Sequence, residues 1–149
     1  MPKIVHTVCD SIIVHAREET PHECCGLLAG KEETGIISKS YPMTNLPSDD
    51  PRIVDLDIPA DRSVRYMMDP IEQFDAIREM RNDGLLLMGI YHSHPHSVAY
   101  PSETDVRLAF YPELTYFIIS LAKESPNLRA FRIVEEEIIA ERIETVPGE

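Results

Sequence analysis

The sequence predicts an α/β protein in which helices sandwich a mixed β-sheet. Two observations support this prediction. Predicted helices and strands alternate along the chain, as they do in layered α/β folds, and short apolar runs lie between turn residues, which is typical of buried strands. The chain has 149 residues, of which 43% are hydrophobic. This is enough to bury a core, and we expect one domain over residues 1–149.

The first part of the chain predicts one helix and one antiparallel pair of strands. The helix is expected to begin at Asp10 or Ser11, both of which can cap it, and to end near Pro21. Residues 26–30 are apolar and bounded by glycines, which predicts a central strand. Residues 36–41 are expected to pair with that strand across a turn rich in charged residues.

The middle of the chain is harder to assign. Residues 42–51 contain three prolines and predict a loop, whereas residues 52–58 alternate as a strand would. Residues 59–69 are ambiguous, with a candidate strand at 65–68. The clearest helix is predicted over residues 70–81, with Asp69 as its cap and proline as its first residue.

The apolar positions of this helix predict which side faces the core. Ile71, Phe74 and Ile77 recur at helical spacing, and Met80 extends the same series. We therefore expect this side to be buried. Gly84 is expected to end the helix.

The last part of the chain predicts a strand that bears candidate metal ligands, followed by further elements. An apolar run over residues 85–91 predicts a buried strand that continues to His94, where Pro95 ends it. The remaining elements are expected to be a helix near residues 102–111 and strands at residues 115–121, 128–134 and 138–143, the last two joined by the acidic turn 135–137.

Two histidines at the end of the predicted strand form a candidate metal site. Side chains alternate along a strand, so His92 and His94 point to the same face, about 6–7 Å apart. With Asp105 they form a nitrogen and oxygen set that suits Zn²⁺, and three protein ligands leave a fourth position for water, as in catalytic zinc sites. A His-x-His pair alone is common by chance. Ser102 and Asp105 alone are better explained as a helix capping box, which competes with a ligand role for Asp105.

A carboxylate far upstream is a second candidate. Glu23 stands just before the predicted strand 26–30. It is explained either as a solvated turn residue or as a general base at the rim of the sheet, and position alone favours the turn.

Composition limits the classes of partner and the location. The net charge of −12 disfavours nucleic acid, because phosphate contacts need clustered Lys and Arg. No apolar run approaches the roughly 20 residues of a membrane span, and the start of the chain lacks a signal sequence. Three cysteines, an odd number, do not form a disulfide framework. We therefore expect a cytoplasmic protein with reduced thiols and no membrane contact.

Taken together, these motifs resemble the JAMM (MPN-plus) metalloprotease family, as a small prokaryotic-type member. That family shows a distant Glu, then H-x-H, ten residues and Asp, with Ser three places before the Asp. Five positions agree in type, order and spacing: Glu23, His92, His94, Ser102 and Asp105.

The resemblance implies a cytidine-deaminase-like fold and a zinc hydrolase. His92, His94 and Asp105 would bind Zn²⁺. Glu23 would act as general base and then as general acid, and Ser102 would stabilise the oxyanion. The implied substrates are amide or isopeptide bonds at the C-terminal tail of ubiquitin-like or sulfur-carrier proteins.

Two other functions remain open at this point. One is a non-catalytic MPN-type scaffold, although a scaffold does not need all five groups. The other is a different zinc hydrolase of the deaminase-like fold, but the H-x-E and P-C-x-x-C motifs of the deaminases are absent from the sequence. Exposed sheet edges make a homodimer plausible.

Overall fold

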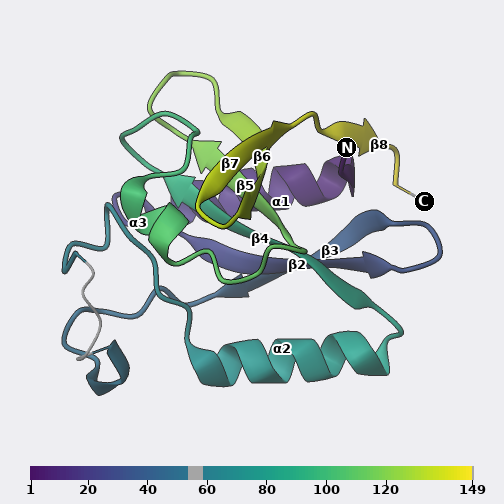
Figure 1. The fold of residues 1–149 in the computed structure, drawn as a ribbon, viewed down its shortest axis with the longest axis horizontal. Helices are drawn as coiled ribbons and strands as arrows, with labels where there is room; N and C mark the ends of the chain where they lie inside the picture. Colours follow the sequence, from purple (N-terminus) through teal and green to yellow (C-terminus); the bar gives the residue numbers. More distant parts are fainter. Residues whose placement is uncertain (54–58, 149) are drawn as a thin grey trace.

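A computed structural model describes residues 1–53 and 59–148, and one eight-stranded sheet runs through these residues (Figure 1). The strand order is β7-β6-β5-β4-β2-β3-β1-β8. The pairs β4–β5, β1–β3 and β1–β8 are parallel and the others are antiparallel, so the sheet is mixed, as predicted. The bounds are β1 Lys3–Val5, β2 Cys25–Lys31, β3 Ile36–Met43, β4 Leu86–His94, β5 Thr115–Ser120, β6 Asn127–Val134, β7 Glu137–Glu141 and β8 Glu144–Val146.

Helices cover both faces of this sheet. The helices are α1 His6–Glu19, α2 Pro70–Asn82 and the short α3 Glu103–Arg107, with a 3₁₀ turn at Pro51–Ile53. Figure 1 shows α1 and α2 on opposite sides of the central strands. The core is divided in the same way, because neighbouring residues of β2 face opposite sides: Leu27 packs in the cluster under α2, and Leu28 packs in the cluster under α1. This confirms the predicted sandwich.

The predicted helix over residues 70–81 is present, but of the residues predicted to face the core only Met80 is buried. Ile71, Phe74 and Ile77 are 65%, 67% and 36% exposed, while Ala76 and Met80 are 6% and 1% exposed. Both sides of α2 carry apolar residues, so periodicity did not distinguish them. The small Ala76 lets the helix lie close to the sheet, and Met80 four residues later shares that side.

The start of the chain also differs from the prediction. The first helix begins at His6 rather than at Asp10 or Ser11, and its N-cap, Val5, makes no side-chain capping bond. The helix begins early because β1 precedes it directly and fixes Val5 in extended backbone, paired with Val146 of β8. Strands of three residues, such as β1 and β8, are too short for alternation to reveal them.

Two other segments are shorter or different from their predictions. The helix predicted over residues 102–111 ends at Arg107, and the N–H of Tyr111 donates instead to the hydroxyl of Tyr116 (3.2 Å). Residues 52 and 53 belong to the 3₁₀ turn, and the rest of the strand predicted there lies outside the described residues. The candidate strand at residues 65–68 forms a single bridge, between Asn45 and Met68. None of the described helices has the length and apolar character needed to cross a membrane.

The corrected orientation of α2 gives the first testable prediction. We expect Met80→Ala to lower the free energy of unfolding by about 2–5 kcal/mol, because it opens a cavity in the buried core. The matched variant Phe74→Ala removes an exposed side chain of the same helix and should change the stability by less than about 0.5 kcal/mol. Urea denaturation of both variants measures the difference, and the opposite ranking would contradict this packing.

Candidate metal centre

The two candidate histidines lie at the end of the central strand β4. Ile90, His92 and His94 alternate along β4 with their side chains on one face, and Ile90 packs in the core cluster beneath α2. His92 and His94 are 1% and 3% exposed, and their Nε2 atoms lie 3.2 Å apart. The strand therefore presents two converging imidazoles from a buried position, as the sequence predicted.

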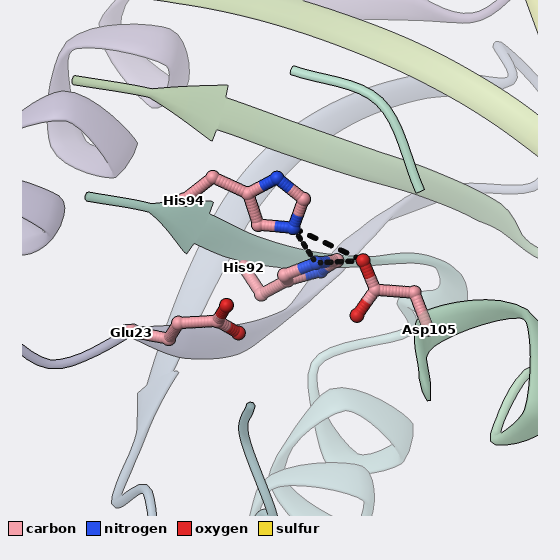
Figure 2. Close-up of side chains that lie close together, drawn as sticks. All are labelled: Glu23, His92, His94 and Asp105. Atoms are coloured by element: carbon pink, nitrogen blue, oxygen red, sulfur yellow. Dashed lines mark hydrogen bonds and ion pairs between the residues drawn. The ribbon is translucent and has the colours of Figure 1, made fainter. Parts of the chain in front are cut away.

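Glu23 reaches the same point because of the register between β2 and β4. The two strands are antiparallel and Cys25 lies opposite His92, so β2 starts where β4 ends. Glu23 stands two residues before Cys25 and is 3% exposed. Figure 2 shows its carboxylate directed toward the histidines and Asp105. The turn interpretation of Glu23 as a solvated residue is therefore wrong.

Asp105 comes from the first turn of α3 and both caps that helix and faces the histidines. Its Oδ2 accepts from the backbone N–H of Ser102 (2.9 Å), while the hydroxyl of Ser102 accepts from the N–H of Asp105 (3.1 Å). The same Oδ2 lies 3.1 Å from His92 Nε2 and 3.0 Å from His94 Nε2. The capping role and the position beside the histidines, which were expected to compete, therefore coexist, because the same oxygen accepts from Ser102 and faces both imidazoles.

Neighbouring groups fix the two imidazole rings. The Nδ1 atom of His94 lies 2.8 Å from the carbonyl oxygen of Val98, which accepts a hydrogen bond when Nδ1 carries the proton and so leaves Nε2 free for a metal. The ring of Tyr66 stacks on His92, with centroids 4.6 Å apart and planes at 27°. Sequence reasoning missed Tyr66, since it lies in the ambiguous segment 59–69 and no motif marks it.

Burial and mutual charge shift the pKa values of these groups. Burial, together with the charge of Asp105, raises the pKa of Glu23 from 4.5 to about 9, against an opposing effect of Arg65. Burial also favours the neutral form of Asp105, but the charges of the two histidines and their hydrogen bonds outweigh it and hold its pKa well below the usual range. For His94, burial lowers the pKa, and the bond to Asp105 and its charge outweigh that effect and raise it.

The donor set fits a divalent cation. One ligand atom each from Glu23, His92, His94 and Asp105 lies within 4.8 Å of the others, and all four residues are buried. Within the described residues, Glu23 Oε1 is buried without a hydrogen-bond partner. Two imidazole nitrogens and carboxylate oxygens are ligands that Zn²⁺ prefers. A cation at their centre would satisfy atoms that otherwise face one another.

Comparison with known proteins places this arrangement in a family. Two curated relatives are each 34% identical to the chain. One, the CysO-cysteine peptidase of Mycobacterium tuberculosis, aligns over 139 residues, which are 92% of this chain and 86% of the relative. The other, the desampylase of Haloferax volcanii, aligns over 115 residues, 74% of each chain.

A solved structure and a family model agree with these relatives. The solution structure of protein DSY2949 from Desulfitobacterium hafniense superposes with a TM-score of 0.83 at 33% identity, covering 99% of this chain and 94% of that one. The family model Prok-JAB, described as prokaryotic homologs of the JAB domain, matches residues 6–134. The chain therefore belongs to the Prok-JAB family, which confirms the JAMM resemblance seen in its motifs.

Proposed function

We propose that this protein is a zinc-dependent peptidase that cleaves the peptide or isopeptide bond after the C-terminal tail of a ubiquitin-like or sulfur-carrier protein. The observation that most supports the proposal is the buried convergence of Glu23, His92, His94 and Asp105 within 4.8 Å. The two relatives described above are named for the cleavage of CysO-cysteine and for desampylation. Amide hydrolysis at a protein tail is the chemistry that best fits both observations.

His92, His94 and Asp105 would hold the zinc ion. Bound zinc lowers the pKa of water to roughly 7 and polarises a carbonyl oxygen. The carbonyl oxygen of Val98 orients the ring of His94, and the ring of Tyr66 packs on that of His92. The cap that Asp105 forms with Ser102 holds the third ligand in the same way.

Glu23 would move the proton during hydrolysis. An opposite charge nearby favours the ionised form of a carboxyl group, so Glu23 is a carboxylate when the metal ligands hold a cation. It would then accept a proton from the attacking water and deliver it to the amine nitrogen of the departing group. Its burial keeps bulk water away from this transfer.

Ser102 would stabilise the negative charge that develops on the carbonyl oxygen. The cap uses its hydroxyl oxygen as an acceptor, which leaves the hydroxyl hydrogen to be donated elsewhere. Loss of one such donor typically costs on the order of 100- to 1000-fold in rate. Ser102 therefore supports the reaction, whereas Glu23 would move the proton and the metal ligands would hold the zinc on which the reaction depends.

A non-catalytic scaffold explains the site less well. Burying two carboxylates and two imidazoles costs free energy unless they are paired or bind a metal. Glu23 Oε1, which lacks a partner in the described part of the chain, has no use in a scaffold. A cytoplasmic location agrees with the three free cysteines, two of them buried. A homodimer formed through a sheet edge remains a prediction.

The proposed function predicts cleavage at a defined bond. Incubated with zinc, the protein should cut ubiquitin-like carriers that bear an extension after a C-terminal Gly-Gly, and mass spectrometry should place the cut directly after the second glycine. The same protein treated with a chelator should be inactive and should recover when zinc is restored. Absence of cleavage across such carriers, by protein shown to contain zinc, would count decisively against the proposal.

The roles assigned within the site predict two different kinds of defect. Glu23→Gln should retain zinc and lose about 100- to 10,000-fold in kcat, because it removes the proton carrier and leaves the ligands. His92→Ala should lose zinc itself. His96→Ala alters an exposed histidine of the same segment and should change neither. Zinc content and kcat of each purified variant decide this, and zinc loss by Glu23→Gln with zinc retention by His92→Ala would reverse the assignment.

The raised pKa of Glu23 predicts a pH-dependent stability of the zinc-free protein. The folded chain favours the protonated form of Glu23, and this preference adds to the free energy of unfolding. The added stability is fully present below pH 4.5 and is lost as the pH rises toward about 9. Glu23→Gln stays neutral, so its stability advantage over the parent protein should grow across that range. Urea unfolding in the presence of chelator measures the difference. Glu32→Gln, at an exposed glutamate, should show no such trend, and a pH-independent difference for Glu23→Gln would refute the assignment.

A further inference from the structure

The backbone of Glu23 is held by hydrogen bonds from outside the sheet. Glu23 precedes β2, so the strand ladder does not satisfy its polar groups, and buried backbone groups need partners. Its N–H donates to the carbonyl oxygen of Arg62 (2.8 Å), and its carbonyl oxygen accepts from Asn45 Nδ2 (2.9 Å). The next residue is tied to β4, since the N–H of Cys24 donates to Ser93 Oγ (2.7 Å).

Both the nitrogen and the oxygen of the Asn45 side-chain amide form hydrogen bonds near Glu23. It is 7% exposed, and its Nδ2 also donates to the carbonyl oxygen of Arg65 (3.0 Å). Its Oδ1 accepts from Arg65 Nη1 (2.8 Å) and from the N–H of Met67 (2.9 Å). These partners fix the orientation of the amide, because the nitrogen faces carbonyl oxygens and the oxygen faces N–H groups.

The guanidinium of Arg65 holds the side chain of Asn45 in place. Its side chain is fully buried, at 0% exposure. Besides Asn45 Oδ1, the guanidinium donates to the carbonyl oxygens of Leu46 (2.7 Å), Pro59 (3.0 Å) and Ala60 (3.3 Å). A planar fork with several donors can bind these fixed oxygens together, which a single ammonium group cannot do. Arg65 thus joins residues 45–46 to residues 59–60.

The same network positions a second part of the site. Tyr66 lies between Arg65 and Met67, both of which contact Asn45. Its ring stacks on the ligand His92. The pair Asn45–Arg65 therefore fixes the backbone of the proposed base and the ring that lies against one proposed ligand.

We propose that Asn45 and Arg65 are positioning residues for the reaction, holding Glu23 at the distance from the metal ligands that proton transfer requires. This inference rests on the proposed function. Neither side chain touches the reacting atoms. Their effect acts through the backbone of Glu23, and a misplacement of about 1 Å can cost on the order of 100-fold in rate.

Asn45→Asp provides a nearly isosteric test. The aspartate keeps an oxygen for Arg65 and for the N–H of Met67, and the cation of Arg65 offsets its charge. It cannot donate to the carbonyl oxygen of Glu23. We expect kcat to fall about 100-fold, with KM and zinc affinity little changed. Asn82→Asp makes the same chemical change at an exposed position and should leave all three quantities unaltered.

Amide hydrogen exchange separates positioning from a purely structural role, and it needs no enzymatic activity. In zinc-loaded Asn45→Asp the amide of Glu23 should exchange faster, while amides of the central strand β5 should keep their protection. Unchanged exchange at Glu23, unchanged kcat, or a loss of protection throughout the sheet would each overturn the proposal. If the parent protein shows no peptidase activity, the exchange result still tests whether Asn45 holds the backbone of Glu23 in place.

A second variant covers the case in which Asn45→Asp does not fold. Arg65→Lys keeps the buried cation and the amide of Asn45 but replaces the fork with a single ammonium. It should lower kcat and increase amide exchange at Glu23, as Asn45→Asp does, but both changes should be smaller. A folded Arg65→Lys protein with the kcat and exchange of the parent would overturn the proposal.

Discussion

The site depends on the antiparallel register between β2 and β4. With Cys25 opposite His92, the start of one strand meets the end of the other, so a carboxylate that is distant in sequence arrives beside two imidazoles. A shift of one residue would turn both histidines to the other face of the sheet, because side chains alternate with a period of two. The bond between the N–H of Cys24 and Ser93 Oγ reinforces this register at the edge of the site.

Charge and burial make the site costly without a cation and favourable with one. Four ionisable groups share a small volume that is largely shielded from bulk solvent. Asp105 is held ionised by the histidines, and Glu23 is driven toward its neutral form by burial and by Asp105. The two carboxyl groups thus differ in their environments, which is a common way for one site to contain both a ligand and a proton carrier.

The loop segment 59–67 links stability to function. It contains Arg65, which is fully buried, and Tyr66, whose ring lies on His92. The backbone carbonyl oxygen of Arg62, in the same segment, accepts a hydrogen bond from the N–H of Glu23. A segment without regular secondary structure can hold a precise position when its polar groups have partners, and here those partners come from Glu23, Asn45, Leu46 and the loop itself.

The sequence by itself determined the strands β2 to β7, the capped helix α2 and the five residues of the motif, because each depends on local spacing, turn residues or side-chain chemistry. Tertiary structure decided the rest. It buried Ala76 beside the predicted Met80 and left Ile71 and Phe74 exposed, since both sides of α2 are apolar and contact with the sheet selects between them. It also let Asp105 cap α3 and face the histidines with one oxygen. The places of Asn45, Arg65 and Tyr66 arise from contacts between distant segments, which no local pattern records.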